Sequence, residues 1–277
     1  MLNARTMNQV LVLTDFSVPA DNALRYAAQL ARALPASLVL LHVRRTSLLD
    51  TDRLTGKYPA RSVAEAQALL QARCDTVAAQ GVACVSQLAA GEVATEFAAA
   101  IRVSGAVLAV ASKCNTERVP DELVDSTVLS LLRRTPCPLL VVPEAYQQQV
   151  LPRQWLVATD GQPVPGATPP AWATALRAGT PLAVRAVLVG DEALATNTDT
   201  LALATALGGS GGAEPQVLHG TDPVGALVGL AHQQPESWLV LWARQRSRLG
   251  RFFHRSITVG VVLHSQVPVL VLSEVPG

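Results

Sequence analysis

Short, continuously apolar runs alternate along this chain with longer segments in which apolar residues recur at helical spacing. Between residues 20 and 34, for instance, Ala23, Leu24, Ala27, Leu30 and Ala31 would share one face of a helix. Strands that alternate with helices are typical of a parallel sheet with right-handed crossovers and helices on both faces. In the first half the predicted strands are Val10–Thr14, Ser37–Val43, Cys84–Leu88, Val107–Ala111 and Leu139–Val142, and the predicted helices are Ala20–Leu34, Val63–Gln80, Val93–Val103 and Asp125–Arg134.

The second half repeats this order of elements. Its predicted strands are Trp155–Ala158, Leu182–Val189, Pro215–Leu218, Trp238–Trp242 and Val269–Leu272, and its predicted helices are Pro170–Ala178, Asp191–Leu207, Pro223–His232 and Ser256–Leu263. Each half opens with an apolar strand that ends in Thr-Asp and closes with a proline-led apolar strand. Repetition on this scale indicates a duplicated domain. We expect one domain at residues 1–146 and a second, shorter one at residues 152–277, joined by the polar segment Ala145–Pro152.

Composition narrows the classes of protein that fit. Hydrophobic residues make up 49% of the 277 residues and aromatic residues only 4%, which suits parallel sheets under Ala-rich helices. A net charge of +1 gives no attraction to nucleic acid or to a membrane surface. Asp15 interrupts the only early apolar run, so no signal peptide is expected. The four cysteines lack zinc-site or disulfide-framework spacing and the five histidines are scattered, so we expect a cytoplasmic protein with reduced thiols and no metal.

Several motifs resemble those of the universal stress protein family. Val10-Leu-Val-Leu-Thr-Asp-Phe-Ser17, Asn22-Ala-Leu-Arg-Tyr-Ala-Ala28 and Leu38-Val-Leu-Leu-His-Val43 are similar to the opening of such a domain. Pro136-Cys-Pro-Leu-Leu-Val-Val142 and Val267-Pro-Val-Leu-Val271 are similar to its closing strand, and Gly220-Thr-Asp-Pro223 is similar to the exit of its third strand.

The resemblance covers nearly the whole chain and implies its fold. That fold is α/β, with two tandem Rossmann-like (adenine nucleotide alpha hydrolase-like) domains. Each domain would hold a five-stranded parallel sheet of order 3-2-1-4-5 with helices on both faces. The resemblance also implies an intramolecular pseudo-dimer in which the fifth strands of the two copies pack together.

Nucleotide-binding members of this family carry a Gly-x2-Gly-x9-Gly-Ser/Thr pattern after the fourth strand, where glycines let backbone amides approach phosphates. In the first copy the three glycine positions hold Ala111, Cys114 and Asp125, and Ser126 stands at the Ser/Thr position. Asp121 and Glu122 add negative charge where phosphates would lie. We therefore expect the first loop to be closed to a triphosphate. Cys114, beside Lys113, is either a reactive thiol or a plain small residue.

The second copy loses the same pattern with the opposite charge. Trp242, Gln245 and Arg255 stand at the glycine positions and Ser256 at the Ser/Thr position, at the start of the predicted helix. The loop between them has no acidic residue and carries five arginines, Arg244, Arg246, Arg248, Arg251 and Arg255. Guanidinium groups beside a helix N-terminus could hold an anion such as the phosphates of ATP or AMP. Alternatively, the loop is a solvated basic segment, or it pairs with acids of the other domain such as Asp121 and Glu122.

Asp15 and Asp160 end their first strands, at the edge where open α/β sheets bind ligands. The resemblance implies that these aspartates contact adenine and that Val43 and Val187 lie nearby. The alternative is that each aspartate caps the turn that follows it. The candidate nucleotide site of the second copy therefore consists of Asp160, Val187, Arg244, Arg246, Arg255 and Ser256, and its degenerate equivalent in the first copy consists of Asp15, Val43, Ser112 and Ser126.

Two functional interpretations remain open from the sequence. The first is a non-enzymatic stress-response protein without a cofactor, whose domains have lost conventional nucleotide binding and act through protein partners. The second is a module that binds ATP or AMP through the arginines of the second copy. Neither interpretation involves nucleic acid or a membrane, and both allow a homodimer.

Overall fold

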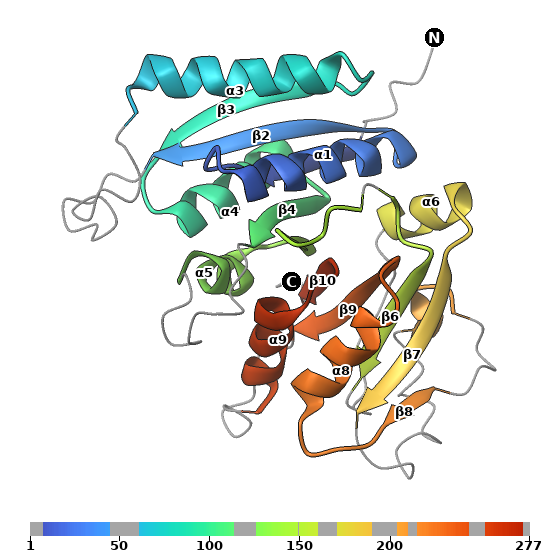
Figure 1. Ribbon diagram of the computed structural model, residues 1–277. Helices are drawn as coiled ribbons and strands as arrows, with labels where there is room; N and C mark the ends of the chain where they lie inside the picture. The colour runs from blue at the N-terminus through green and yellow to red at the C-terminus, as the bar shows by residue number, and fades with distance from the viewer. Residues whose placement is uncertain are drawn as a thin grey trace.

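The computed structural model describes residues 8–44, 61–113, 126–148, 150–159, 171–189, 204–209, 215–243 and 253–273. Its centre is one continuous ten-stranded sheet (Figure 1). The first half contributes β1 (Asn8–Leu13), β2 (Ala36–Arg44), β3 (Cys84–Ala90), β4 (Leu108–Lys113) and β5 (Leu139–Pro143), and the second half contributes β6 (Gln154–Thr159), β7 (Ala183–Val189), β8 (Gln216–Leu218), β9 (Ser237–Ala243) and β10 (Val269–Ser273).

The order of strands across the sheet is β3-β2-β1-β4-β5-β10-β9-β6-β7-β8. Each half therefore has the predicted order 3-2-1-4-5, with parallel pairing inside each half. Where the halves meet, β5 and β10 pair antiparallel with Leu140 opposite Leu270, which confirms the prediction that the closing strands lie side by side. The two expected sheets are thus joined into one, because β5 and residues 269–272 of β10 are apolar and buried and would otherwise form an exposed unpaired edge.

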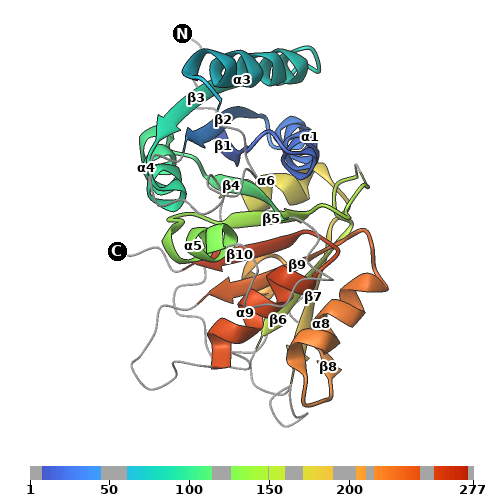
Figure 2. The same cartoon turned by 60° about the vertical axis from the view of Figure 1, so that its left-hand side comes forward.

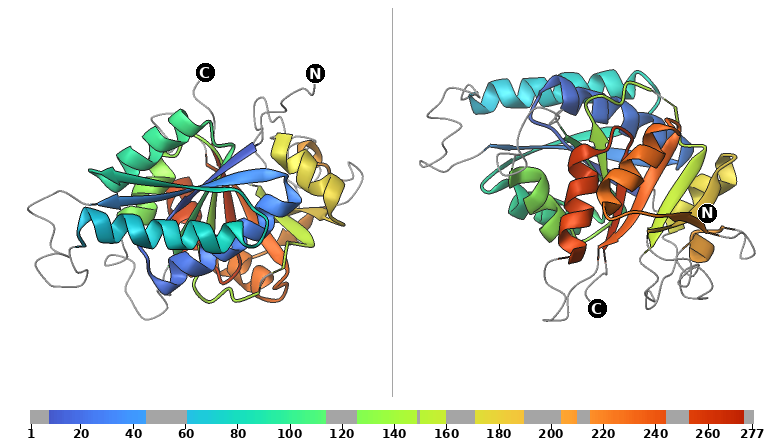
Figure 3. Two further views of the ribbon diagram at one scale, coloured as in Figure 1. Left: turned by 90° about the horizontal axis from the view of Figure 1, so that it is seen from above. Right: turned by 60° about the horizontal axis from the view of Figure 1, so that its bottom comes forward.

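Helices cover both faces of this sheet. One face carries α1 (Val18–Ala33), α3 (Val63–Ala78) and α6 (Ala171–Gly179). The other face carries α4 (Val93–Ser104), α5 (Ser126–Arg134), α8 (Pro223–His232) and α9 (Phe253–His264). Figure 2 shows α1 and α4 on either side of the strands of the first half, and Figure 3 shows how the accumulated twist makes the strands fan out.

Each hydrophobic core runs through both halves. An aromatic cluster lies where the halves meet and consists of Tyr26, Tyr146, Trp155, Trp172 and Trp238. Within it the indole Nε1 of Trp238 donates a hydrogen bond to the hydroxyl of Tyr26 at 2.8 Å. The segment expected as a polar linker is tied into this cluster, because Tyr146 is buried and its carbonyl accepts a hydrogen bond from Asn22 Nδ2 at 2.8 Å. The two repeats therefore form one packed body.

Two expected helices differ from the structure or fall outside it. The last helix begins at Phe253 instead of Ser256, so Ser256 is its fourth residue and does not precede its first turn. Most of the expected helix Asp191–Leu207 lies outside the described residues. The remaining predicted elements agree with the structure to within a few residues at their ends.

Candidate functional site

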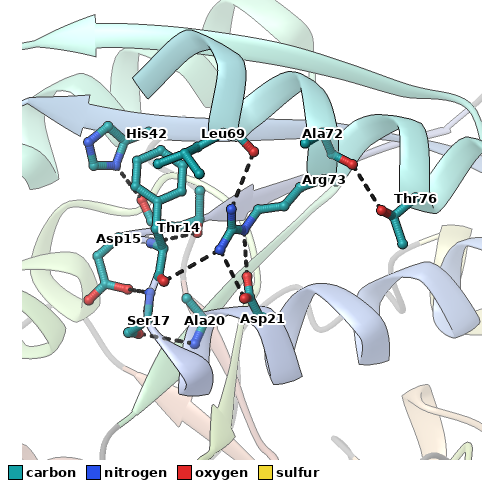
Figure 4. Close-up of polar contacts among 11 residues, drawn as sticks. Thr14, Asp15, Ser17, Ala20, Asp21, His42, Leu69, Ala72, Arg73 and Thr76 are labelled. Carbon is teal, nitrogen blue, oxygen red and sulfur yellow. Dashed lines mark hydrogen bonds and ion pairs between the residues drawn. The ribbon is translucent and has the colours of Figure 1, made fainter. Parts of the chain in front are cut away.

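The carboxyl end of β1 in the first repeat is closed by hydrogen bonds within the chain (Figure 4). After the strand ends, Thr14 is buried, its N–H donates to the carbonyl of Leu41 at 2.9 Å and its Oγ1 accepts the N–H of Phe16 at 3.0 Å. The next residue, Asp15, is exposed, and its Oδ1 accepts the N–H of Ser17 at 2.9 Å. Asp15 therefore makes the turn-capping contact that one of its two interpretations expects, and its contact with a nucleotide stays a prediction.

Phe16 is the central residue of this edge. Its φ of 67° lies in the left-handed region, which non-glycine residues rarely adopt, and the contacts of its backbone N–H and carbonyl hold it there. The phenyl ring packs against the ring of His42, with centroids 4.2 Å apart. The guanidinium carbons of Arg61 and Arg73 lie 5.2 Å and 5.0 Å from the ring centroid, within the range of cation–π interaction.

Arg73 ties three elements together at this edge. From α3, its Nε and Nη2 donate to the two carboxylate oxygens of Asp21 at 2.6 Å and 2.9 Å, in the first turn of α1. Its Nη2 also reaches the carbonyl oxygen of Phe16 at 3.4 Å. A planar guanidinium suits this forked geometry because it can serve both carboxylate oxygens at once. The charge of Arg73 is thus already paired within the chain. No sequence pattern predicted this contact, because Asp21 and Arg73 lie on different helices.

His42 lies on β2 beneath the same turn. Its Nδ1 is 2.8 Å from the carbonyl oxygen of Thr14, and because a carbonyl can only accept, Nδ1 carries the proton. Burial lowers the pKa of His42, and the positive charges of Arg61 and Arg44 act in the same direction, although the bond to Thr14 and the charge of Asp15 oppose them. The neutral ring is therefore the form that fits this site.

The N-termini of α4 and α8, at the carboxyl edges of the two repeats, are also occupied by side chains of the chain itself. At α4 the carboxylate of Glu92 accepts the amides of Ala94 and Thr95 at 3.3 Å and 2.9 Å, and it pairs with Arg134 Nη1 at 2.7 Å. The hydroxyl of Thr95, followed by these amides and the Arg134 charge, lowers the pKa of Glu92 despite the opposing effect of burial. A carboxylate that accepts the first amides of a helix leaves them unavailable to a phosphate.

In the second repeat Asp222 caps the N-terminus of α8. Its Oδ1 accepts the N–H of Gly225 at 3.0 Å. A Cβ on Gly225 would lie 2.3 Å from the other carboxylate oxygen, so glycine is required for this close approach. The Gly220-Thr-Asp-Pro223 motif therefore has a local structural reason, namely the cap of α8.

The end of β4 is anchored across the two repeats. Lys113 is 5% exposed, and its Nζ donates to the carbonyl oxygens of Leu263 and, at 3.0 Å, Ser265. Leu263 lies in the last turn of α9, where a positive charge also interacts favourably with the negative end of the helix dipole. The strand that leads into the first candidate loop is therefore fixed to the second repeat by a buried ammonium group.

The remaining residues of the first candidate site lie on three different elements. Val43 is buried in the core on β2, and Ser112 lies half-buried on β4. Ser126 is the first residue of α5, one residue after the predicted start at Asp125, and Cys114, Asp121, Glu122 and Asp125 lie outside the described residues. Asp15 thus lies just beyond the end of β1 and Val43 lies on the neighbouring strand β2, and the rings of Phe16 and His42, the residues next to them in the chain, pack against each other.

Only part of the second candidate site falls within the described residues. Val187 is fully buried on β7, and β6 ends at Thr159, directly before Asp160, which is not described. Arg244 and Arg246 are not described either, whereas Arg255 and Ser256 lie in the first turn of α9, which contains no acidic residue. Trp242 lies near the carboxyl end of β9, and its indole nitrogen has no hydrogen-bond partner among the described residues.

The two candidate sites start from opposite edges of the sheet. Because β5 and β10 are antiparallel, and β4 and β9 run parallel to them, Lys113 and Ala243 end their strands in opposite directions. The expected alternative that the arginine loop pairs with Asp121 and Glu122 concerns residues outside the described part of the chain. The two strands that lead to these loops, β4 and β9, run in opposite directions.

Among the described residues, no three His, Cys, Asp or Glu side chains gather as a metal would need. The described helices include none that is both long enough and apolar enough to span a bilayer.

The fold and its two edges define a class: a tandem α/β protein in which two Rossmann-like units share one sheet. The family model described as "Universal stress protein family" matches residues 7–143 and again residues 156–273. The chain therefore belongs to the universal stress protein family and carries the family's domain twice, which confirms the resemblance seen in its motifs.

Solved structures support the same fold over the full length. A universal stress protein from Archaeoglobus fulgidus DSM 4304 is 16% identical, covers 97% of this chain and 99% of its own, and gives a TM-score of 0.69. A putative universal stress protein from Pseudomonas aeruginosa UCBPP-PA14 is 14% identical, covers 98% of this chain and 94% of its own, and gives a TM-score of 0.67. A universal stress protein in complex with cAMP matches 50% of this chain and 98% of its own, at 20% identity and a TM-score of 0.40. None of the curated protein sequences compared with this chain matches it.

Proposed function

We propose that this tandem universal stress protein is a non-enzymatic regulatory protein of the stress response, which acts through protein contacts and needs no cofactor. In this proposal the repeats occupy residues 1–146 and 152–277, and the protein works in the cytoplasm as an intramolecular pseudo-dimer. The observation that carries the proposal is the closed carboxyl edge of the first repeat. There, Asp15, Arg73 and Glu92 are engaged by partners from the chain itself.

The physical argument concerns what a nucleotide would have to displace. An adenine beside Asp15 would meet the Phe16 ring, which lies between His42 and the two guanidinium groups. A phosphate at the start of α4 would have to displace the carboxylate of Glu92 from the amides of Ala94 and Thr95. Each lost charge-assisted hydrogen bond costs about 1.5–3 kcal/mol, so binding would have to recover several such contacts.

The first test is nucleotide binding by the full-length protein. We expect calorimetry with ATP, ADP and AMP, each with Mg²⁺, to show no saturable heat, and we expect no release of phosphate from ATP. Protein purified without added nucleotide, when denatured, should release no stoichiometric small molecule detectable by mass spectrometry.

Asp15→Asn tests the first repeat. It removes the charge of Asp15 but keeps a side-chain oxygen that can still accept the N–H of Ser17. Saturable micromolar binding by the wild type that this variant weakens would contradict the proposal. ATP hydrolysis that survives purification and depends on Asp15 would contradict it as well.

A second candidate function is an ATP- or AMP-binding module that uses the second repeat. Two observations favour it: the first turn of α9 contains Arg255 without an acidic neighbour, and the indole N–H of Trp242 has no partner among the described residues. An anion would relieve the unfavourable position of a positive charge at a helix N-terminus. In this candidate Arg244, Arg246 and Arg255 bind phosphate oxygens, and Asp160 faces the base or the ribose.

The same titration distinguishes the two candidates. If the second is correct, wild type binds ATP or AMP, and joint replacement of Arg244, Arg246 and Arg255 by alanine abolishes binding. Asp15→Asn should then leave the affinity unchanged, because it alters the opposite edge of the sheet. Equal binding by the wild type and the triple variant would exclude the arginine site.

A further inference from the structure

Strand β3 forms one outer edge of the ten-stranded sheet. It comes first in the order of strands and pairs with β2 along its whole length, from Cys84 to Ala90. Among the described residues, no segment other than β2 is hydrogen-bonded to its backbone. None of its seven residues is buried, whereas all five residues of β5 are. The left panel of Figure 3 shows β3 as the uppermost strand, with α3 beside it.

This edge lacks the features that usually keep a sheet edge from pairing with another chain. Short strands, charged side chains, proline and bulges are the common ones. The seven residues of β3 include no charged residue and no proline, and their unbroken register with β2 leaves no bulge. The edge strand at the other end of the sheet, β8 (Gln216–Leu218), has only three residues. The long, uncharged edge therefore belongs to the first repeat.

Helix α3 extends this uncharged surface above the strand. The hydroxyl of Ser86 on β3 donates to Oε1 of Gln71 at 3.4 Å, so Gln71 marks the side of the helix that faces the open edge. Arg73, which binds Asp21 of α1, marks the opposite side. Residues three, four and seven positions from Gln71 share its side. The exposed residues on this side are Ala64, Gln67, Gln71, Asp75 and Ala78.

We propose that the open edge of β3 is a homodimer interface, at which β3 of a second copy of this chain pairs antiparallel with it. A twofold axis perpendicular to the sheet would pass through Gln87, the middle residue of the strand. The molecule already contains a junction of this kind, because β5 and β10 pair antiparallel and the helices α1 and α6 lie on one face. The interface is independent of both candidate functions.

The strand is self-complementary about this axis. Gln87 would lie opposite the same residue of the second copy, and Val85 would lie opposite Ala89. Val85 is 64% exposed, so the pairing would cover a large apolar side chain that is otherwise in water. No two like charges would meet, because the strand carries none. The unpaired N–H and C=O groups of each edge would gain partners.

The exposed side of α3 is self-complementary about the same axis. Gln71 is the middle residue of the exposed set and contacts Ser86, next to the middle of the strand. Two antiparallel copies of the helix would therefore meet at Gln71, with Gln67 of one copy beside Asp75 of the other.

The carboxylate of Asp75 already accepts from Gln71 Nε2 at 2.8 Å and can accept a second amide from Gln67. At the ends of the set Ala64 would face Ala78, and small side chains allow two helices to approach closely. This match of charge and size about one axis indicates a second copy, because a different protein would not need it.

The test measures the mass and the amide exchange of the full-length protein over a concentration series. Light scattering should show a rise from 29.1 kDa towards twice that mass as the concentration increases. Hydrogen exchange of the peptide that contains β3 should slow over the same range. The peptide that contains β8 should exchange at a constant rate, because that edge takes no part in the pairing.

Gln87→Glu keeps the size of the side chain but places two carboxylates opposite each other at the axis. It should weaken dimerisation at least about tenfold, because like charges are brought together as water is excluded. Gln216→Glu makes the same change on the edge strand β8 and is the matched control, with dimerisation equal to wild type. Thermal unfolding followed by circular dichroism should be the same for both variants and wild type at a concentration where all are monomeric.

Three results would overturn the proposal. The first is a mass of one chain at every concentration, which would leave the edge to a strand of another protein. The second is a dimer that Gln87→Glu and Gln216→Glu weaken equally or not at all. The third is a dimer in which the exchange of β3 does not slow.

Discussion

At the residue scale, the first repeat shows how a binding edge can be closed without a large insertion. Thr14, Asp15 and Ser17 use their side chains to satisfy amides of the turn that follows β1. After the strand ends, the ring of Phe16 packs against the guanidinium of Arg73. The charge of Arg73 is itself paired with Asp21. Each of these contacts is ordinary in size, but together they engage the amides of the turn and the guanidinium of Arg73 within the chain.

His42 makes this edge sensitive to pH. Its pKa is lowered in the folded protein, mainly by burial, so the folded state prefers the neutral ring. The stability gained from that preference is present above the ordinary histidine pKa of about 6.5 and is lost as the pH falls towards the folded-state value.

We expect the free energy of unfolding of wild type to fall between about pH 7 and 5.5, and the fall to be smaller in His42→Gln. Urea denaturation followed by circular dichroism measures it. His232→Gln, which alters an exposed histidine, is the matched control and should follow wild type. An equal dependence on pH in wild type and His42→Gln would contradict the assignment.

At the element scale, contacts between the halves are as important as the pairing within them. Strand β5 pairs with β10, and the end of β4 reaches the last turn of α9 through Lys113. A buried ammonium is costly unless its donors are used, and here at least two carbonyl oxygens accept from it. Helix α9 is thereby attached at its carboxyl end to the first repeat, while its amino end carries Arg255 of the second.

Replacing Lys113 with methionine should destabilise the protein by about 1–3 kcal/mol, because the carbonyl oxygens of Leu263 and Ser265 lose a buried donor. Chemical denaturation gives this difference directly. Arg102→Met, at an exposed position near the end of α4, should change stability by no more than about 0.5 kcal/mol. If the two variants lose the same stability, Lys113 does not anchor α9.

At the scale of the whole molecule, the two repeats are parts of one packed body. The sheet is continuous, and both hydrophobic cores include residues from each half. The hydrogen bond from Trp238 to Tyr26 and the aromatic cluster around it lie at the junction. Separating the halves would expose β5 and β10 as unpaired apolar edges.

The two repeats should consequently unfold in one transition, and the chain contains a reporter for each of them. All four tryptophans lie in the second half and all four cysteines in the first. Across a urea series, tryptophan fluorescence follows the second repeat, and pulsed alkylation of the buried Cys137 follows the first.

The two midpoints should coincide, as in a two-state transition. Leu140→Ala, at the β5–β10 pairing, should lower both midpoints together by removing buried contacts worth about 2–5 kcal/mol. Val85→Ala, on the exposed edge strand, should leave both nearly unchanged. Loss of tryptophan burial before Cys137 becomes reactive would show that the repeats unfold separately.

The sequence by itself determined the repeat, the order of elements and the pairing of the closing strands. These follow from local properties, since a short apolar run is buried wherever it lies, and an apolar closing strand needs a neighbour. The boundaries were less certain where two kinds of signal competed. The last helix, for example, begins at Phe253, three residues before the start at Ser256 that the expected Ser/Thr position suggested.

Only the tertiary structure decided which polar and charged side chains meet at the candidate edge and at the junction of the repeats. Asp21 and Arg73 are separated by 52 positions, and Lys113 and Leu263 by 150, so no local pattern indicated that they meet. The physical reason is that hydrophobic periodicity records which side of an element is buried, whereas the partner of a charged or polar group depends on which elements the completed sheet brings together.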